Sequence, residues 1–274
     1  MRPPVPYHGG KQRIADQIVA LLPPHEHYVE PYCGGLSVLL AKPRSRMETV
    51  NDLDGELVTY WRVLRDRPGD LEVAVGLTPH SRAEHVAAFT PAADDLEVAR
   101  RVHVRLTQGV NARLRPTGWR WHRKTAGGST MTGYLAWYRD RIPAAAERLV
   151  GVSLDCRPAL EVAREYGTEP SALLYVDPPY PAEVRNSSNY RCEMSDPADH
   201  RELAKALHEC RAAVVVSGYA CDLYDRELYP DWHRHEIAAQ TTQGGSAKAT
   251  AEVLWSNRPL GVQGALFDVG GRSA

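Results

Sequence analysis

Strand and helix patterns alternate at both ends of the chain and stop in between, which constrains the fold more than any other feature. A short strand pattern at residues 27–30 leads through glycines into a helical stretch and then into a second strand, which ends at Asp52. The alternation resumes at residue 152 and includes the fully apolar run 172–176, as expected of a buried parallel strand. This layout predicts a doubly wound α/β fold with a mainly parallel sheet.

The middle of the chain differs in periodicity and in charge. Residues 56–149 show helical spacing and no convincing strand. Between Arg100 and Arg148 there are eleven basic and two acidic side chains, in a chain whose formal net charge is −1. We therefore predict a catalytic domain formed by residues 1–55 and 150–274, interrupted by a helical, basic insert.

Composition narrows the class of protein. Hydrophobic residues make up 43% and charged residues 24% of the chain, as in ordinary globular proteins. No stretch approaches the roughly 20 apolar residues that span a bilayer, and residues 1–4 lack the apolar core of a secretory signal. The five cysteines are scattered without a Cys-x-x-Cys pair, so neither a disulfide framework nor a zinc ribbon is indicated. We expect a cytoplasmic protein with no contact to membranes.

The most specific motif is Asp177-Pro178-Pro179-Tyr180, directly after the apolar run 172–176. Ligands of open α/β sheets bind at the carboxyl ends of the strands. The two prolines stiffen the loop and remove two N–H donors. The remaining groups suit a planar ring with an exocyclic amine, because Asp177 and the Pro178 carbonyl can accept its two N–H bonds while Tyr180 stacks on the ring. The alternative is a turn whose aspartate caps a neighbouring helix.

The loop after the first strand contains Glu30 and the glycine pair Gly34-Gly35. Glycines between a strand and a helix let a ligand approach the backbone. The spacing is not Gly-x-Gly-x-x-Gly, and Glu30 would repel a pyrophosphate, so a dinucleotide is not favoured. A carboxylate better matches the cationic amino group of S-adenosylmethionine, and Asp52 ends the next strand, where ribose hydroxyls are commonly held. The alternative is that the glycine pair serves packing alone.

A third segment, residues 7–11, reads Tyr-His-Gly-Gly-Lys and on its own is no more specific than a surface turn. In this order, however, the three segments resemble the Dam-type DNA adenine-N6 methyltransferases and their phage-borne relatives. That family opens with Tyr/Trp-x-Gly-Gly-Lys and continues with Val-Glu-Pro-Phe-x-Gly-x-Gly, which residues 29–36 match except at Tyr32 and Leu36. Leu36 stands where the family has its last glycine, which bears on how closely a cofactor approaches. Asn51-Asp52, the unchanged Asp-Pro-Pro-Tyr and the closing segment 252–257 complete the match.

The resemblance covers residues 7–61 and 152–257 and implies a class I S-adenosylmethionine-dependent methyltransferase fold whose middle region recognises the target. By resemblance, the cofactor is held by Tyr7, Lys11, Asp52 and Asp177. Asp155, at the end of its strand, is placed to bond the adenine amine of the cofactor. Together with Glu30 and Gly34, these residues form the predicted cofactor site.

The basic insert is expected to contact double-stranded DNA. Arginines along the groove edges supply positioning and salt-dependent affinity, and Arg and Asn can also read guanine and adenine. The candidates lie in or beside the loops of the insert and are Asn111, Arg113, Arg115, Arg120, Arg123 and Lys124. Trp119 and Trp121 beside them could stack or wedge. The alternative is that the tryptophans form the core of a small helical domain and the arginines a solvated face.

The predicted reaction is direct transfer of the sulfonium methyl group to adenine N6 in a base flipped out of the duplex. Asp177 to Tyr180 receive the base, Tyr190 could close over it, and the segment 217–219 could line the pocket. No metal and no covalent step are needed, so we interpret Cys33 as a packing residue.

Three rival functions stay open at this point. Cytosine-N4 transfer uses the same geometry, although Asp rather than Ser at position 177 favours adenine. RNA or a protein glutamine could be the substrate, and a degenerate methyltransferase could serve as a DNA-binding module. The sequence does not separate a restriction-modification enzyme with a partner endonuclease from a phage or regulatory enzyme, and it does not indicate an oligomeric state.

Overall fold

A mainly parallel sheet forms the centre of the molecule. The structure is a computed structural model that describes residues 1–121, 130–181, 190–192, 194–238 and 251–261. The strands of the sheet lie in the order β3-β2-β1-β4-β5-β7-β6. They are β1 (His27–Glu30), β2 (Met47–Asn51), β3 (Ser153–Asp155), β4 (Ala172–Val176), β5 (Ala213–Tyr219), β6 (His233–Ile237) and β7 (Glu252–Ser256).

The order in which strands are added to the sheet reverses between β1 and β4. From β1 to β3 the strands extend the sheet in one direction, and from β4 on they extend it in the other. β1 pairs in parallel with β2 on one side and with β4 on the other, and only β7 runs antiparallel to its neighbours. In doubly wound sheets a ligand crevice forms at such a reversal, beyond the carboxyl ends of the strands. This topology confirms the predicted class I methyltransferase fold.

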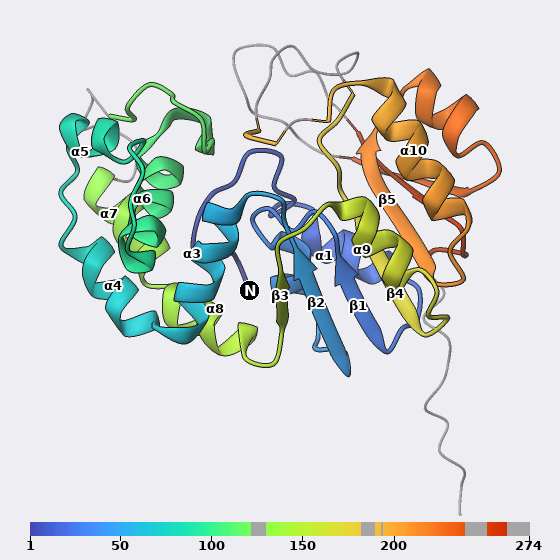
Figure 1. The fold of residues 1–274 in the computed structure, drawn as a ribbon, viewed down its shortest axis with the longest axis horizontal. Helices are drawn as coiled ribbons and strands as arrows, with labels where there is room; N and C mark the ends of the chain where they lie inside the picture. Colours follow the sequence, from blue (N-terminus) through green and yellow to red (C-terminus); the bar gives the residue numbers. More distant parts are fainter. Residues whose placement is uncertain (122–129, 182–189, 193, 239–250, 262–274) are drawn as a thin grey trace, which may run out of the picture.

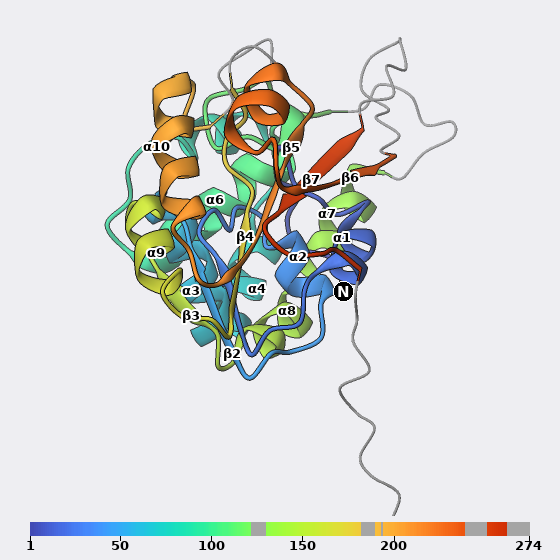
Figure 2. The same cartoon turned by 90° about the vertical axis from the view of Figure 1, so that its right-hand side faces the viewer.

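Helices cover both faces of the sheet, and the side chains of β4 show why. Leu173 and Tyr175 face one apolar cluster, whereas Leu174 and Val176 face the other. Figure 2 shows α9 and α10 on one side of the sheet and α1 and α2 on the other. The helices of the sheet half are α1 (Ala15–Leu21), α2 (Ser37–Ala41), α9 (Ala159–Tyr166), α10 (Pro197–His208) and the π-helical segment η3 (Leu223–Leu228).

Between β2 and β3 the described residues form helices and one isolated bridge, between Gly109 and Trp119. These helices are α3 (Gly55–Asp66), α4 (Pro68–Gly76), α5 (Arg82–Ala87), α6 (Asp95–Gln108), the short 3-10 turn η1 (Val110–Ala112), α7 (Met131–Arg139) and α8 (Ile142–Leu149). Figure 1 shows α4 to α7 on one side of the molecule, with α3 and α8 between them and the sheet. One apolar cluster includes Leu39 near the sheet as well as Leu64 and Val102 of the helical half. The division into two domains therefore stays a prediction.

One strand that the sequence analysis did not predict, β6, has a weak hydrophobic pattern. β6 reads His-Arg-His-Glu-Ile and is exposed at all but its last residue, so it lacks the alternation that marks a strand.

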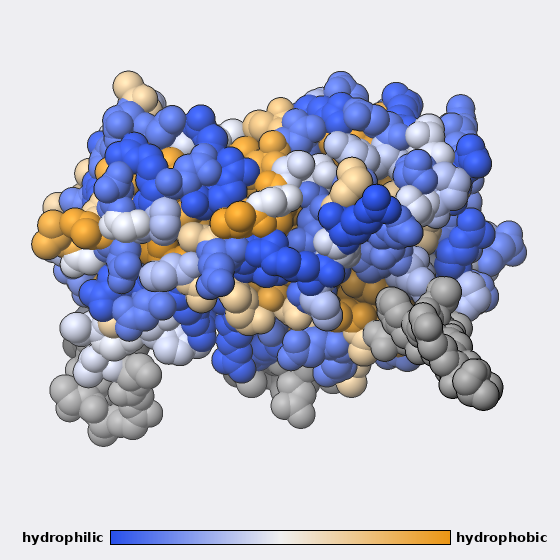
Figure 3. Space-filling view, turned by 90° about the horizontal axis from the view of Figure 1, so that it is seen from below, coloured by the Kyte–Doolittle hydropathy of each residue, from blue (hydrophilic) through white to orange (hydrophobic). Residues whose placement is uncertain are grey.

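Among the described residues, no helix has the length and apolar character to cross a membrane. Figure 3 shows the face seen from below, where hydrophilic surface alternates with separate apolar areas. Scattered exposed apolar residues of this kind need no partner to explain them.

Candidate active site

Three loops that follow parallel strands surround a cavity of about 360 Å³. Glu30 ends β1, Asp52 follows β2 and Asp177 follows β4, so these carboxylates come from neighbouring strands where the sheet reverses. The N-terminal turn, with Tyr7 and Lys11, lines the same cavity. The structure thus brings together most of the residues that the sequence predicted for a cofactor site.

Lys11 links the N-terminal turn to the loop after β4. Its Nζ lies 2.8 and 2.7 Å from the two carboxylate oxygens of Asp177, and it donates to the Tyr180 hydroxyl at 2.7 Å and to the Gly9 carbonyl at 3.0 Å. The side chain is 6% exposed, so the ion pair is largely removed from water. Burial disfavours the charged form, but the carboxylates of Asp177 and Glu252 outweigh it and raise the pKa of Lys11 well above its usual range.

Burial also changes the proton affinity of Asp177. It raises the pKa of this carboxyl to about 6, with Glu252 adding to the effect and Lys11 opposing it. The side chain is 19% exposed and lines the cavity. Because a carboxylate offers about four lone-pair positions, Asp177 can stay paired with Lys11 and still accept a hydrogen bond from a ligand.

Tyr7 explains why the loop after β1 needs its glycines. A Cβ on Gly34 would lie 2.9 Å from the Tyr7 ring, and one on Gly35 would lie 2.7 Å from the Tyr7 Cβ. Gly34 also has a φ of 44°, in the left-handed region that glycine tolerates. Its N–H donates to the Asp52 carboxylate at 3.0 Å. The tyrosine, the glycine loop and the aspartate therefore form one packed wall of the cavity.

Leu36 has the backbone conformation expected of the glycine it replaces. Its φ is 53° and its ψ is 31°, a left-handed conformation that costs an L-residue about 1 kcal/mol. The side chain is fully buried in the apolar core and does not line the cavity, whereas Gly34, Gly35 and Ser37 do. The substitution thus leaves the cavity open.

Backbone N–H groups and a tyrosine, rather than cations, hold the other two carboxylates. Glu30 accepts hydrogen bonds from the Tyr28 hydroxyl and from the Leu39 N–H, and burial raises its pKa to about 7. Asp52 accepts from the N–H of Asp54 as well as from the glycine loop, and burial raises its pKa to about 6. Both groups lie on the cavity and hold protons more tightly than surface carboxyls do.

Asp155 lies apart from this group. It is level with Asn51 in the pairing of β3 with β2. Its carboxylate lies 2.6 Å from the Arg157 guanidinium and accepts the Cys156 N–H at 2.8 Å. It is not among the residues that line the cavity, which include Pro158 instead. Its contact with a cofactor adenine stays a prediction.

Sequence reasoning gave no role to Glu252, the first residue of β7. Its Oε1 accepts hydrogen bonds from the Tyr180 and Ser217 hydroxyls and lies 3.5 Å from the Lys11 Nζ. The Tyr180 ring packs edge-on against Tyr219 at 4.7 Å between centroids. A charged residue at the start of an otherwise apolar run was the available signal, because a buried charge needs partners.

Residues 190–192, beyond the Asp-Pro-Pro-Tyr loop, line part of the cavity. Tyr190 lies against Tyr7 and His8, with ring centroids 6.4 and 5.7 Å apart. The next residue, Arg191, also lines the cavity and pairs with Asp54 at 3.3 Å. This segment therefore meets the N-terminal turn and the loop after β2. The predicted closure of Tyr190 over a flipped base stays a prediction.

Comparisons with known proteins agree with this geometry. The family model of the D12 class N6 adenine-specific DNA methyltransferases matches residues 7–92, which include the N-terminal turn, the glycine loop and Asp52. The Type II methyltransferase M1.LlaDCHI of Lactococcus lactis subsp. cremoris is 23% identical over 273 residues, which span 92% of this chain and 93% of that protein. The chain therefore resembles the D12 class over these residues, and both comparisons support a DNA adenine methyltransferase. The resemblance and the enzyme class predicted from the motifs are confirmed.

Solved structures resemble this methyltransferase only remotely. Precorrin 8w decarboxylase of Methanobacterium thermoautotrophicum has a TM-score of 0.41 and 10% identity over 93% of this chain and 95% of its own. The rRNA methyltransferase AviRa of Streptomyces viridochromogenes has a TM-score of 0.35 and 14% identity over 89% of this chain and 82% of its own. At these TM-scores neither protein bears on the activity of this chain.

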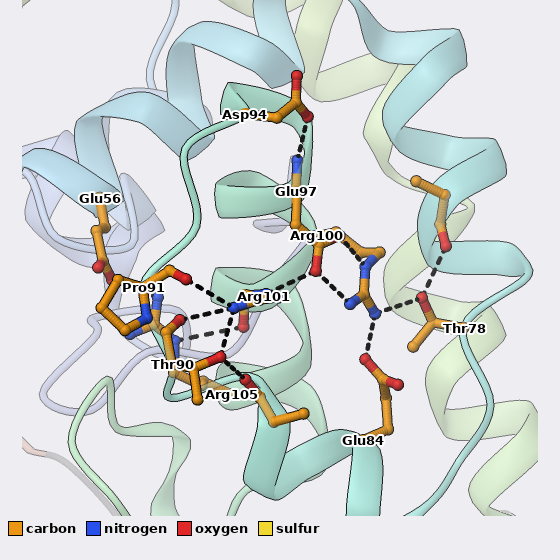
Figure 4. Close-up of polar contacts among 12 residues, drawn as sticks. Glu56, Thr78, Glu84, Thr90, Pro91, Asp94, Glu97, Arg100, Arg101 and Arg105 are labelled. Carbon is orange, nitrogen blue, oxygen red and sulfur yellow. Dashed lines mark hydrogen bonds and ion pairs between the residues drawn. The ribbon is translucent and has the colours of Figure 1, made fainter.

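Several arginines of the helical half of the methyltransferase are paired internally. Arg100 bonds Glu84 and Glu97, while Arg101 bonds Glu97 and Thr90. Figure 4 shows these side chains pointing toward one another between neighbouring helices. In the same way Arg105 bonds Glu56 of α3, and Arg148 bonds the buried Glu48 of β2. All four acids lie outside the segment 100–148, so the charge count overstated the positive charge available to a ligand.

The predicted DNA-contacting loop projects from the end of α6. The Val110 N–H donates to Gly118 at 2.9 Å, and the Arg120 N–H donates to Gln108 at 2.7 Å, so the loop closes like a hairpin. Asn111 is exposed and has a positive φ of 64°. The His8 N–H donates to Ala112 at 2.9 Å, which joins this loop to the N-terminal turn beside the cavity.

The charged members of the prediction have different surroundings. Arg115 is exposed, whereas Arg113 and Arg120 are half-buried, and Arg120 lies over the Tyr134 ring at 5.1 Å. Arg123 and Lys124 lie outside the described residues. Trp119 stacks on His80 with centroids 4.5 Å apart, while Trp121 is exposed. One tryptophan therefore packs within the helical half and the other faces solvent.

The thiol of Cys33 lies beside the site without a sign of activation. Burial raises its pKa well above the usual range, which disfavours the nucleophilic thiolate. In the parts of the chain that the structure describes, no three His, Cys, Asp or Glu side chains gather to hold a metal ion.

Proposed function

We propose that this chain belongs to the D12 class and transfers the methyl group of S-adenosylmethionine to N6 of adenine in double-stranded DNA. The observation that carries the proposal is Asp177, which lines the cavity while its carboxylate is paired with Lys11. A carboxylate held rigidly at the carboxyl end of β4 can accept a hydrogen bond from an exocyclic amine. Such positioning, with a methyl donor beside it, accounts for much of the rate enhancement of a direct transfer.

The cavity fits S-adenosylmethionine chemically. The residues proposed to hold the cofactor are Tyr7, Lys11, Glu30, Gly34, Asp52, Asp155 and Asp177. Glu30 matches the cationic amino group, and Asp52 matches the ribose hydroxyls. The Ser37 hydroxyl is buried, lines the cavity and has no hydrogen-bond partner in the described part of the chain, so a ligand can satisfy it. When bound, the cofactor supplies an electrophilic methyl group on its sulfonium.

The loop after β4 is proposed to receive the target base. Asp177 and the Pro178 carbonyl accept the two N–H bonds of the amine, which localises its lone pair for attack. Pro179 lines the cavity. Tyr180 has its hydroxyl fixed by Lys11 and Glu252, and this holds its ring for contact with the base. Because the amine of a paired adenine is engaged in the duplex, the base leaves the stack to reach this loop.

The helical half, residues 56–149, is proposed to recognise the target sequence. Its hairpin-like loop touches the N-terminal turn through Ala112 and His8, so DNA bound on this loop lies next to the cavity. Asn111, Arg113 and Arg115 are proposed as base and phosphate contacts, with Arg120, Arg123 and Lys124 as further phosphate contacts. A pairing with a restriction endonuclease that reads the same site is proposed as the biological setting.

The test is methyl transfer from isotope-labelled S-adenosylmethionine to unmethylated duplex DNA, followed by nucleoside analysis. Labelled N6-methyladenine is the expected product, and sequencing for modified positions then gives the recognition site. Labelled N4-methylcytosine would overturn the base assignment. Label only in single-stranded DNA or in RNA would overturn the duplex substrate. Asp231→Asn, at an exposed position outside the cavity lining, is a matched control for Asp177→Asn in the same assay.

A further inference from the structure

Glu252 is a buried carboxylate to which the proposed function assigns no role of its own. It starts β7, the strand that runs antiparallel to β5, and its side chain is 5% exposed. Three contacts converge on one of its oxygen atoms, Oε1. That atom accepts the Tyr180 hydroxyl at 2.7 Å and the Ser217 hydroxyl at 2.5 Å, and it lies 3.5 Å from the Lys11 Nζ.

Two carboxylates therefore share one ammonium. Lys11 contacts both oxygens of Asp177 and lies within ion-pair distance of Glu252. The charged and titratable groups that face Asp177 are Lys11 of the N-terminal turn, Glu30 of β1, Tyr175 of β4, Tyr180 of its own loop, Tyr219 of β5, Tyr224 of η3 and Glu252 of β7. Lys11 is the only cation among these groups.

A carboxylate that alone neutralises a buried ammonium binds protons weakly and is a poor hydrogen-bond acceptor. A second carboxylate on the same ammonium has the opposite effect, because like charges raise each other's proton affinity. Glu252 also accepts a hydrogen bond from the Tyr180 hydroxyl, which itself accepts one from Lys11. Both effects act on groups proposed to touch the target base.

We propose that Glu252 is a positioning residue of the methyl-transfer site, which shares Lys11 with Asp177 and anchors Tyr180. Sharing the ammonium keeps Asp177 basic enough to accept a hydrogen bond from the target amine. Anchoring holds the Tyr180 ring in one orientation. The proposal rests on the proposed function for its consequence in catalysis, but the charge sharing itself is a property of the free protein.

The first test is Glu252→Gln, which keeps an oxygen acceptor and the side-chain volume and removes the charge. The carboxyl carbon of Asp177 is titrated by NMR in protein labelled at aspartate, with its signal assigned by its loss in Asp177→Asn. The expected result is a lower pKa of Asp177, by about one unit or tenfold in proton affinity. Glu236→Gln on β6, where the side chain is 56% exposed, should leave the titration unchanged. An unchanged or raised pKa in Glu252→Gln overturns the charge sharing.

This readout separates the two proposals. A lowered pKa of Asp177 in a protein that methylates no DNA supports the charge sharing and contradicts the proposed function. In an active enzyme, the acid limb of the pH profile of kcat/KM should move to lower pH by the same amount in Glu252→Gln. A limb that stays in place overturns the catalytic consequence.

Tyr180→Phe serves where the glutamine variant does not fold. It keeps the ring and removes only the hydroxyl between Lys11 and Glu252. The expected result is a kcat roughly tenfold lower, with the KM for DNA changed less than about twofold. The reason is that the variant loses the hydrogen bonds that hold the ring in place during the transfer, not a bond to DNA. An unchanged kcat overturns the anchoring.

Discussion

In the sheet half of the molecule one group of buried charges lies beside a cavity, whereas in the helical half many charged side chains pair with one another. Lys11, Asp177 and Glu252 lie at the carboxyl ends of the strands, with two carboxylates on one ammonium and an oxygen of Asp177 accessible from the cavity. In the helical half, Arg100 and Arg101 are held by acids on the same or adjacent helices. The charged groups beside the cavity can still bond a ligand, whereas those of the helical half are already bonded to one another within the protein.

This difference teaches that a run of basic residues in a sequence is not yet a binding surface. The acids that neutralise Arg105 and Arg148 come from distant segments of the chain, namely Glu56 and Glu48. The hairpin-like loop after α6 is the part of the helical half where the proposed contacts to DNA remain. We therefore expect arginines that are close in sequence to differ in whether they contribute to stability or to DNA binding.

Lys11→Met should have the largest effect, because it leaves Asp177 and Glu252 buried without their shared cation. Breaking a buried ion pair costs about 3 kcal/mol or more, so we expect urea denaturation to show a loss of this size together with the loss of methyl transfer. Lys205→Met on α10, which is exposed, is the control. A Lys11→Met protein of wild-type stability would show that the sheet half does not depend on this charge.

Arg100→Met should act on stability rather than on DNA. The side chain is 16% exposed and bonds two glutamates, so we expect the free energy of unfolding to fall by about 2 kcal/mol. The salt dependence of DNA binding should not change, since the guanidinium is engaged within the fold. A shallower salt dependence in this variant would mean that the internal network opens to contact phosphates, contrary to the comparison.

Arg113→Ala combined with Arg115→Ala should show the reverse pattern. Each phosphate contact contributes about 0.9 to the slope of log affinity against log salt, so loss of both should lower the slope by up to about 2 and weaken binding roughly tenfold. Stability should change less than in Arg100→Met. Filter binding at several salt concentrations measures the affinity for DNA and its salt slope. An unchanged slope would show that this loop does not contact DNA.

The pH dependence of methyl transfer should be the smallest of these effects, and it should be reversible. Burial raises the pKa of both Asp52 and Asp177 to about 6, above the ordinary value of about 4. As pH falls through about 6, the carboxylates that accept hydrogen bonds are lost, so methyl transfer should decline.

Stability should change in the other direction, because a carboxyl whose pKa is raised on folding favours the folded state most below pH 4 and loses that contribution as pH rises through 6. Activity and unfolding curves measured between pH 7 and pH 5 check this. Parallel loss of both would assign the acid limb to unfolding.

Local patterns predicted the sheet half well. The parallel strands were readable because each is short and bounded by turns and because β4 and the first part of β5 are apolar. The motifs marked the carboxyl ends of the strands, where doubly wound sheets bind ligands. Glu252 could not be placed, since its partners Tyr180 and Lys11 lie far from it in the chain and meet only when β7 pairs with β5. The partners of Arg105 and Arg148 were missed for the same reason, because Glu56 and Glu48 lie far from them in the chain. Pairing between distant segments carries no local signal.

The conformation of Leu36 shows a further reason why the sequence alone was insufficient. A leucine gives no hint of a positive φ, which glycine would have indicated. Packing of the leucine side chain into the core holds the backbone in the left-handed region. Only the structure shows that the side chain turns away from the cavity.

The central claim is that Asp177 orients the target amine, and single-turnover methyl transfer to duplex DNA tests it most directly. Wild-type protein, Asp177→Asn and the Asp231→Asn control are compared at saturating cofactor and DNA, with both affinities measured alongside. We predict that Asp177→Asn transfers the methyl group at least about 100-fold more slowly while it still binds DNA as tightly as the wild type. A rate within a fewfold of wild type for Asp177→Asn would contradict the account.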